Sequence, residues 1–380
     1  MKKIRVLVVI GTRPEAIKMA PVIIALKKDA RFSCELCVTA QHREMLDQVL
    51  HIFQVEPTYD LNLMLKGQSI ENIIEKAIPK LSEVYRQASP DVILVHGDTA
   101  TTLCGSLSAF LHKIPIGHVE AGLRSGNLMA PWPEEGNRRI VSSISSIDFA
   151  PTELAKENLI AENKDTKSIY VTGNTIVDAL LSQKKRLDLV KLQKYYHSIV
   201  EDFNPENKSY ILITAHRREN FGSGIRDICL SIQNICDRKE NIEFIWPVHP
   251  NPEISKVVYN LLGKNKRIHL IEPQDYDEFL YLMSISYLIL SDSGGVQEEA
   301  PSLGKPVLLM RDETERPEAL SSGCVTLVGS NPSTITEKTI ELIDNKEKYM
   351  EMAKSVNPFG DGTAALKIAD ALAKKFGVVS

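Results

Sequence analysis

The sequence predicts an α/β protein with two parallel-sheet domains in series. Short β-branched apolar runs alternate with longer amphipathic segments, a pattern typical of parallel strands that are covered by helices on both faces. The alternation stops in a polar stretch at 182–208 and then starts again. The length of 380 residues also exceeds that of one typical domain. Two doubly wound domains are therefore expected.

The first half opens with a β-branched run that ends at Gly11, which predicts a strand, and the apolar residues that follow it have helical spacing. By the same criteria we expect strands at 4–10, 35–40, 91–96, 114–119 and 169–172, and helices at 14–28, 42–53, 70–86, 101–112 and 153–163. The stretch at 118–140 is rich in Gly, Pro and charged residues, so we expect a loop there.

The alternation resumes after the polar stretch. We expect strands at 210–214, 242–247, 268–271, 287–291, 306–310 and 324–328, and helices at 225–236, 253–262, 278–283 and 296–303. A last helix is expected at 363–376, and its pattern alone would allow it to pack on either half.

The composition is that of a globular protein without a polyanionic partner. A formal net charge of -4 argues against a basic surface for nucleic acid or anionic membranes. The apolar run at 4–10 is too short to span a bilayer and lacks a cleavage pattern, so a cytoplasmic location is expected. Of the six cysteines, only Cys34 and Cys37 have ligand-like spacing. They lie in an expected strand, where residues three apart face opposite sides, so no metal site is expected.

Polar residues directly follow several expected strands. In open parallel sheets the carboxyl ends of the strands form one edge, and ligands bind there. Two domains that faced each other with these edges would form a cleft, where we expect the ligand. The residues concerned are Arg13, His96, Asp98 and Glu120 in the first half, and His216, His249 and Ser293 in the second.

The segment SDSGGVQEE joins an expected strand to a helix through two glycines. Backbone N–H groups at such a turn, together with the hydroxyl of Ser293, suit a phosphate. Glu299 could accept hydrogen bonds from a ribose diol, and Arg316 could neutralise a phosphate. Arg13 and Lys18 add positive charge in the first half. A diphosphate is therefore the expected ligand.

The stretch at 118–140 gathers three carboxylates and three arginines, which favours acid/base chemistry, although a solvated surface loop has a similar composition. The chain contains no GxGxxG after a strand, no GxxxxGK loop, no GxSxG elbow and no HExxH. These absences argue against NAD chemistry, P-loop hydrolysis, α/β-hydrolase chemistry and zinc proteolysis. The chemistry that remains is acid/base catalysis by carboxylates and histidines on a nucleotide-diphosphate ligand.

Seven motifs, in order over nearly the whole chain, resemble those of the bacterial non-hydrolysing UDP-N-acetylglucosamine 2-epimerases. They are GTRPEAIK (11–18), TAQHR (39–43), VHGD (95–98), HVEAGLR (118–124), PWPEE (131–135), TAHRREN (214–220) and DSGGVQEEAPSLG (292–304). The resemblance implies a GT-B fold with two Rossmann-like domains, a homodimer, and no need for NAD or an obligatory metal. It also implies interconversion of UDP-GlcNAc and UDP-ManNAc, a precursor for surface polysaccharides.

The resemblance further implies domain limits and residue roles. Residues 1–172 and 363–380 would form the domain with the catalytic carboxylates, and residues 173–362 the UDP-binding domain. The implied acid/base set is Asp98, Glu120 and Glu134, assisted by His216 and Arg138. Arg13 and Lys18 would stabilise the diphosphate, and Gln274 and Phe279 would line the uracil pocket. UDP would be held by Ser293, Gly294, Gly295, Glu299 and Arg316.

Two of these assignments have a simpler alternative, and the carboxylate that accepts the proton is left open. His216 could be a strand-end histidine satisfied by hydrogen bonds, and Asp98 could be the N-cap of the following helix. Some relatives bind a second UDP-GlcNAc as an activator. The corresponding candidates here are Gln41, His42, Arg43, Gln68, Arg217 and His249. Gly67 stands where some activator-dependent relatives have arginine, which argues against a requirement for the activator.

The chemistry of the sugar supports this reaction. The C2 hydrogen is not adjacent to a carbonyl and is barely acidic, so direct deprotonation would be very slow. If UDP leaves C1 first, the oxocarbenium-like centre acidifies that hydrogen. Elimination then gives a bound 2-acetamidoglucal, and UDP adds back after reprotonation from the other face.

Three other functions stay open. A hydrolysing epimerase would release ManNAc and UDP, although its relatives usually diverge after GTR, where this chain reads PEAIK. A UDP-sugar GT-B glycosyltransferase would transfer the sugar to an added acceptor. A non-catalytic nucleotide-sugar binder would leave the C2 hydrogen unexchanged in deuterium oxide.

Overall fold

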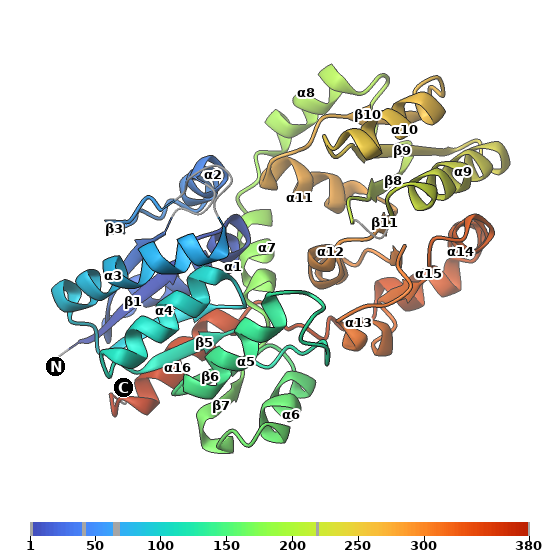
Figure 1. The fold of residues 1–380 in the computed structure, drawn as a ribbon. Helices are drawn as coiled ribbons and strands as arrows, with labels where there is room; N and C mark the ends of the chain where they lie inside the picture. Colours follow the sequence, from blue (N-terminus) through green and yellow to red (C-terminus); the bar gives the residue numbers. More distant parts are fainter. Residues whose placement is uncertain (1–2, 40–42, 64–68, 218–219, 379–380) are drawn as a thin grey trace. The chain divides into compact units, whose positions relative to one another are not determined.

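The computed structural model describes residues 3–39, 43–63, 69–217 and 220–378, and the chain divides into two compact units (Figure 1). Unit 1 comprises Met1–Ser182 and Phe359–Ser380, and unit 2 comprises Gln183–Pro358. The chain therefore leaves unit 1 after Ser182 and re-enters it at Phe359. Each unit contains one parallel sheet, which confirms the predicted α/β class.

The sheet of unit 1 has seven described strands, all parallel, in the order β3-β2-β1-β4-β5-β6-β7. Their bounds are β1 (Ile4–Ile10), β2 (Phe32–Val38), β3 (Tyr59–Asp60), β4 (Val92–His96), β5 (Ile116–Val119), β6 (Ile147–Ala150) and β7 (Ile169–Val171). Val6 of β1 pairs with Cys34 of β2 on one side and with Val92 of β4 on the other. The strand order reverses between β1 and β4, and ligands bind at such switch points.

Helices cover this sheet in two layers. Helix α4 packs against α3 and α5 in one layer, and α1 packs against α2 and α16 in the other. The bounds are α1 (Arg13–Lys28), α2 (Arg43–Phe53), α3 (Ile70–Ala88), α4 (Ala100–Leu111), α5 (Glu134–Ile144), α6 (Glu153–Ala161), α7 (Thr175–Lys184), which runs on into unit 2, and α16 (Ala364–Lys375), with the 3-10 turn η1 (Thr166–Ser168). Leu7, Val9 and Val95 of the strands pack with Leu81 of α3 in one core, because strands buried on both faces are apolar throughout.

Unit 2 repeats this architecture. Its sheet has six described parallel strands in the order β10-β9-β8-β11-β12-β13, with the switch point between β8 and β11. The strands are β8 (Ser209–Thr214), β9 (Ile242–Pro247), β10 (Ile268–Ile271), β11 (Leu288–Ser291), β12 (Val307–Leu309) and β13 (Val325–Leu327). The helices are α8 (Leu189–Ile199), α9 (Ser223–Arg238), α10 (Pro252–Leu262), α11 (Tyr276–Ile285), α12 (Gly294–Glu299), α13 (Pro317–Ser321), α14 (Pro332–Asp344) and α15 (Lys346–Ala353), with the 3-10 turn η3 (Ala300–Leu303). Ile213, Trp246 and Leu290 lie in its core.

The expected loop at 118–140 is wrong from Glu134 onward, where α5 begins. Pro131 and Pro133 stand just before the helix, and Glu134 and Glu135 occupy its first turn, where carboxylates favour the positive end of the helix dipole. These are start signals for a helix, but prolines and charges also predict loops. The segment carries both kinds of signal, and its sequence alone does not separate a helix start from a loop.

The polar stretch at 182–208 is also not irregular, because it contains α8. Leu192 and Tyr196 are buried one turn apart, while the rest of the helix is mostly polar, so its apolar periodicity is weak. Elements that were not predicted from the sequence at all are β3, β6, α7, α13, α14, α15 and the 3-10 turn η1.

The division between the units follows contacts that lie far apart in sequence. Expected limits were after residue 172 and before residue 363, whereas the units divide after Ser182 and before Phe359. The carboxylate of Asp178 accepts the backbone N–H groups of Ala364 and Ala365, so the first turns of α7 bind the start of α16. This pairing assigns most of α7 to unit 1.

The described cysteines are all free thiols, and each except the half-buried Cys34 is buried. No cluster of three or more His, Cys, Asp or Glu suited to a metal ion occurs in the described ranges. Among the described helices, none combines the length and apolar character needed to cross a membrane.

Candidate active site

The carboxyl ends of β4 and β5 bring two predicted carboxylates to the same edge of unit 1. The two strands are neighbours in the sheet, with His96 paired to Val119. Asp98 follows β4 after Gly97, and Glu120 follows β5 directly. Glu120 has a left-handed backbone, with a φ of 62°, which is uncommon for a residue with a side chain and often marks a functional position.

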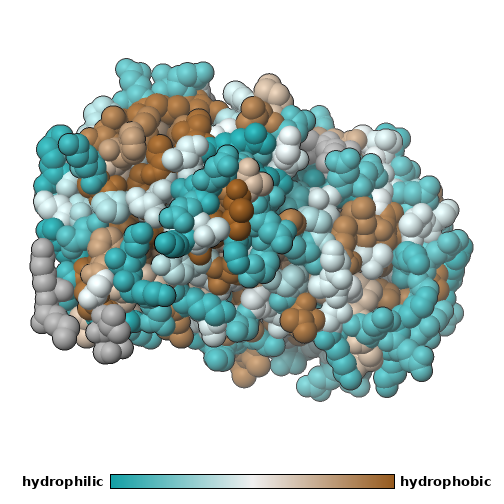
Figure 2. Space-filling view, turned by 90° about the horizontal axis from the view of Figure 1, so that it is seen from below, coloured by the Kyte–Doolittle hydropathy of each residue, from teal (hydrophilic) through white to brown (hydrophobic). Residues whose placement is uncertain are grey.

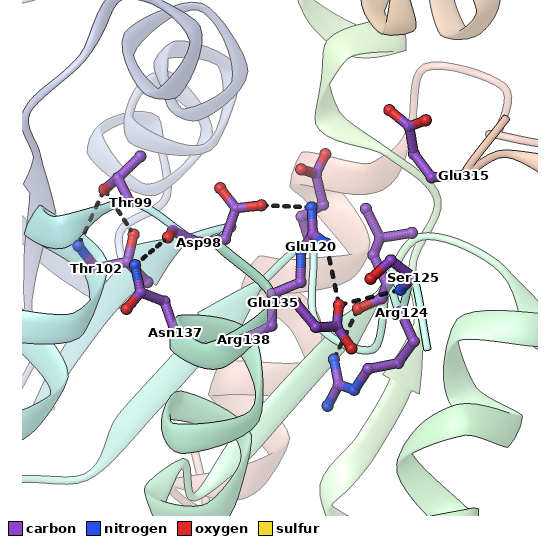
Figure 3. A network of polar contacts seen from close by, with 12 residues as sticks. Asp98, Thr99, Thr102, Glu120, Arg124, Ser125, Glu135, Asn137, Arg138 and Glu315 are labelled. Carbon is purple, nitrogen blue, oxygen red and sulfur yellow. Dashed lines mark hydrogen bonds and ion pairs between the residues drawn. The ribbon is translucent and has the colours of Figure 1, made fainter. Parts of the chain in front are cut away.

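Asp98 is held by helix α5 through both its backbone and its side chain (Figure 3). Its Oδ2 lies 2.6 Å from Nη2 of Arg138, and its backbone oxygen accepts a 2.7 Å hydrogen bond from Nδ2 of Asn137. The N-cap of α4 is Thr99, whose hydroxyl accepts from the backbone N–H of Thr102. The capping role that sequence alone allowed for Asp98 therefore belongs to its neighbour.

Glu135 is the fully buried carboxylate that supports this arrangement. It accepts hydrogen bonds from the backbone N–H of Ser125 at 3.0 Å and from the guanidinium groups of Arg138 and Arg139, each at 3.2 Å. Burial alone would raise the pKa of Glu135, but these donors lower it. Glu134, one position earlier, has a buried Oε2 with no hydrogen-bond partner among the described groups.

The carboxylate of Glu120 receives donors from distant parts of unit 1. Lys18 of α1 forms a short ion pair with its Oε2, and Nδ2 of Asn174 donates to the same oxygen at 2.8 Å. Nε2 of the buried His96 lies 3.7 Å from it. Burial lowers the pKa of His96 to about 4, so this imidazole is neutral beside the carboxylate at neutral pH.

Arg13 lies at the first position of α1, beyond the carboxyl end of β1. Thr12 and Glu15 form a capping box there, and Oε2 of Glu15 accepts the N–H groups of Gly11 and Thr12 at 2.9 and 2.7 Å. The half-buried Arg13 makes no ion pair within the described part of the chain. Its charge is therefore available to an anion.

Unit 2 places His216 at its own switch point. His216 follows β8, and the fully buried Asp292 follows β11, the neighbouring strand. Oδ2 of Asp292 accepts the backbone N–H groups of His216 and Arg217, both at 2.9 Å, and Nδ2 of Asn220 at 3.0 Å. Nδ1 of His216 lies 3.5 Å from Oδ1 of Asp292. Burial lowers the pKa of His216, and the Asp292 carboxylate opposes that shift.

The glycine turn predicted to hold UDP is present beside Asp292. Ser293 precedes α12 without capping it by its side chain. A Cβ on Gly294 would lie 2.8 Å from Nη1 of Arg316, so a side chain there would displace that guanidinium. Arg316 itself donates to Glu298 and Glu315, each at 2.7 Å. Glu299 accepts a 3.1 Å hydrogen bond from the hydroxyl of Tyr276.

The expected uracil residues lie at the start of α11 in the same unit. Oε1 of Gln274 accepts the Tyr196 hydroxyl at 2.9 Å, and Nε2 donates to the backbone oxygen of Glu272 at 2.6 Å. Phe279 is half-buried on α11. The amide of Gln274 is thus already oriented by its neighbours.

Half of the six activator candidates lie outside the described residues, namely Gln41, His42 and Gln68. Arg43 pairs with Asp47 and Asp60. In unit 2, Arg217 lies 3.9 Å from Glu315, and the ring of His249 stacks on that of His216 with centroids 6.1 Å apart.

Sequence reasoning missed four residues that hold the predicted ones in place: Glu135, Asn137, Asn174 and Asp292. Asn174 and Asp292 both follow strands at the ligand edge, so the rule that selected Asp98 and Glu120 would also have found them. Glu135 and Asn137 depend on the turn geometry of α5, which was expected to be a loop.

A family model for UDP-N-acetylglucosamine 2-epimerases matches residues 24–373. A UDP-N-acetylglucosamine 2-epimerase of Neisseria meningitidis is 50% identical over 97% of this chain and 99% of its own length. One of Escherichia coli is 48% identical over 97% and 98%, respectively.

Solved structures agree with these relatives. The crystal structure of UDP-GlcNAc 2-epimerase from Neisseria meningitidis bound to UDP-GlcNAc has a TM-score of 0.90 at 50% identity, and covers 98% of this chain and 100% of that one. A Staphylococcus aureus structure with UDP has a TM-score of 0.88 at 40% identity, with coverages of 99% and 98%.

Proposed function

The chain belongs to the UDP-N-acetylglucosamine 2-epimerase family, and we propose that it interconverts UDP-GlcNAc and UDP-ManNAc at C2 without releasing free sugar. The observation that supports this most is the pair of carboxylates at the sheet edge of unit 1. Asp98 after β4 and Glu120 after β5 each face a cation, Arg138 and Lys18 respectively. A carboxylate that is held in a fixed orientation can accept a proton from a carbon centre.

The proposed reaction is an elimination followed by a re-addition. The bond from C1 to the diphosphate oxygen breaks, the C2 proton passes to a carboxylate, and a C1–C2 double bond forms. A second group then protonates C2 on the opposite face, and UDP re-forms the bond to C1. We assign the proton transfers to Asp98, Glu120 and Glu134, assisted by Arg138 and by His216.

The negative charge that develops on the departing diphosphate must be stabilised by cations. Arg13 has no competing partner within the described residues, and Lys18 is held by Glu120. A diphosphate that attracted Lys18 would weaken its hold on Glu120, so departure of UDP and the proton affinity of this carboxylate would be linked. In unit 2 we assign UDP to Ser293, Gly294, Gly295, Glu299 and Arg316, with uracil at Gln274 and Phe279.

We further propose a homodimer that uses helices α4 and α5 of unit 1. These helices pack against each other, and they expose large apolar side chains at Phe110, Leu111 and Ile140, with 54%, 65% and 49% of their surface accessible. Figure 2 shows that hydrophobic side chains gather in several places on one face of the molecule. Light scattering after gel filtration tests this, and Leu111→Glu should shift a dimer toward the monomer.

The experiment that tests the function is incubation of the protein with UDP-GlcNAc in deuterium oxide. Proton NMR and mass spectrometry should show deuterium at C2 of both UDP-GlcNAc and UDP-ManNAc, because the proton returned to C2 comes from a group that exchanges with solvent. Free ManNAc as the main product would identify a hydrolysing enzyme instead. Unlabelled substrate would overturn the proposal, and transfer to an added acceptor would identify a glycosyltransferase.

A further inference from the structure

Asn174 connects the catalytic edge of unit 1 to the segment by which the chain re-enters that unit. It lies between β7 and α7 and is 2% exposed. Its backbone N–H donates to the backbone oxygen of Phe359 at 2.6 Å, and its Nδ2 donates to Oε2 of Glu120 at 2.8 Å. One residue therefore contacts both the start of the returning segment and a carboxylate assigned to proton transfer.

The direction of the Asn174 amide is fixed by a third hydrogen bond. Oδ1 accepts the backbone N–H of Ile176 at 3.1 Å, in the first turn of α7. Since this oxygen must face a donor, the NH₂ group must face Glu120. The side chain thus has two separable roles, as an acceptor for the helix start and as a donor to the carboxylate.

The returning segment is docked tightly against this point. A Cβ on Gly173, whose φ is +89°, would lie 3.2 Å from the oxygen of Phe359, and a Cβ on Gly360 would lie 3.3 Å from Cα of Gly173. Two glycines therefore allow the backbones to touch. Asp178, one turn further along α7, holds the first N–H groups of α16. Asn174 cannot move without moving this junction.

Glu120 gains orientation from this contact. Its left-handed backbone, with a φ of 62°, is an unfavourable conformation that surrounding contacts must maintain. Lys18 and Asn174 converge on the same oxygen, and the charged groups that face it include Lys18 and, when protonated, His96. Lys18 is a point charge that the substrate diphosphate can attract, whereas Asn174 is a neutral donor fixed by three hydrogen bonds.

We infer that Asn174 is a positioning residue for the epimerisation: its amide holds the Glu120 carboxylate in its reactive orientation. This role rests on the proposed function. Asn174 is not among the residues assigned to UDP, which are those of unit 2 together with Arg13 and Lys18 at the diphosphate.

Two variants of one residue separate positioning from mere structure. Asn174→Asp keeps the acceptor for Ile176 but places a second carboxylate against Glu120, and Asn174→Ala removes both functions. We expect kcat to fall about 10-fold in the alanine variant and at least about 100-fold in the aspartate variant, with KM and UDP affinity within about threefold of wild type. Melting temperatures of both variants are measured as well, because a second buried carboxylate beside Glu120 costs stability in addition to turnover.

Asp178→Asn serves as the matched control, because it weakens the same junction without touching Glu120. It should lower the melting temperature and leave kcat within about twofold. An aspartate variant at position 174 that turns over as fast as the alanine variant, or losses of kcat that simply follow melting temperature, would overturn the inference. Wild-type protein that leaves UDP-GlcNAc unlabelled in deuterium oxide would overturn the proposed function first, and this role with it.

Discussion

Arg138 lies between two carboxylates, with Nη2 2.6 Å from Oδ2 of Asp98 and Nη1 3.2 Å from Oε2 of Glu135. The planar guanidinium therefore contacts the half-buried Asp98, which follows β4, and the fully buried Glu135 of its own helix. Because Glu135 also binds the N–H of Ser125, the orientation of Asp98 depends on the whole turn before α5.

Arg138→Lys should therefore lower kcat by about 10- to 100-fold with little change in KM. An ammonium cannot contact both carboxylates in this fork geometry, so Asp98 loses its fixed orientation. Arg139→Lys is the matched control, since Arg139 is 41% exposed and contacts only the far oxygen of Glu135 at the site. Steady-state rates of both variants test this, and equal losses would mean that the helix surface, and not Asp98, is affected.

Asp98→Asn, Glu120→Gln and Glu134→Gln should each retain UDP binding and lose turnover by about 100-fold or more, because an amide neither accepts nor returns the C2 proton. Calorimetric titration with UDP separates binding from chemistry. Deuterium exchange at C2 should fall in step with epimerisation. Near-native turnover in any one of these variants would remove that residue from the acid/base set.

Asp292→Asn should reduce turnover by about 10- to 100-fold through His216. The substitution replaces an anion that accepts the N–H groups of His216 and Arg217, and so releases the loop after β8. A double-mutant cycle with His216→Ala checks the route. If Asp292 acts through His216, its substitution should cost little further activity in the His216→Ala background, and fully additive losses would contradict this.

His96 should make the folded protein sensitive to acid. Burial lowers its pKa from 6.5 to about 4, so the folded state binds fewer protons than the unfolded state in this window. Stability is then complete above pH 6.5 and declines as the pH falls toward 4, by about 3 kcal/mol for this group. Denaturant unfolding at pH 7 and pH 4.5 should show a smaller loss for His96→Asn than for wild type. Equal losses would show that His118, whose pKa burial also lowers, dominates the effect.

Residue positions that follow from strand periodicity were predictable from the sequence. The apolar runs of β1, β4 and β5 set where the sheet edge lies, which is enough to place Arg13, Asp98 and Glu120 there. The same holds for His216 and Ser293 in unit 2. A rule about strand ends needs no knowledge of tertiary contacts, which is why it succeeded.

The strand-end rule places Asn174 and Asp292 at these edges, but it could not predict which residues they contact. Asn174 is 54 positions from Glu120, and Asp292 is 76 from His216. Lys18 was expected to face a diphosphate, and the structure pairs it with Glu120, 102 positions away. Helix α5 was not predicted because its start signals, prolines followed by acidic residues, are also typical of a loop.

The position of α16 has a consequence for synthesis of the protein. Arg31 and Asp178, both in the first half of the chain, contact Asp370 and the first N–H groups of α16, respectively. A ribosome that has completed β7 has not yet made this helix, and unit 2 must emerge first. Until then the surface of unit 1 that receives Leu372 stays uncovered. Shortening the protein from its carboxyl end should therefore leave unit 1 in an aggregation-prone state.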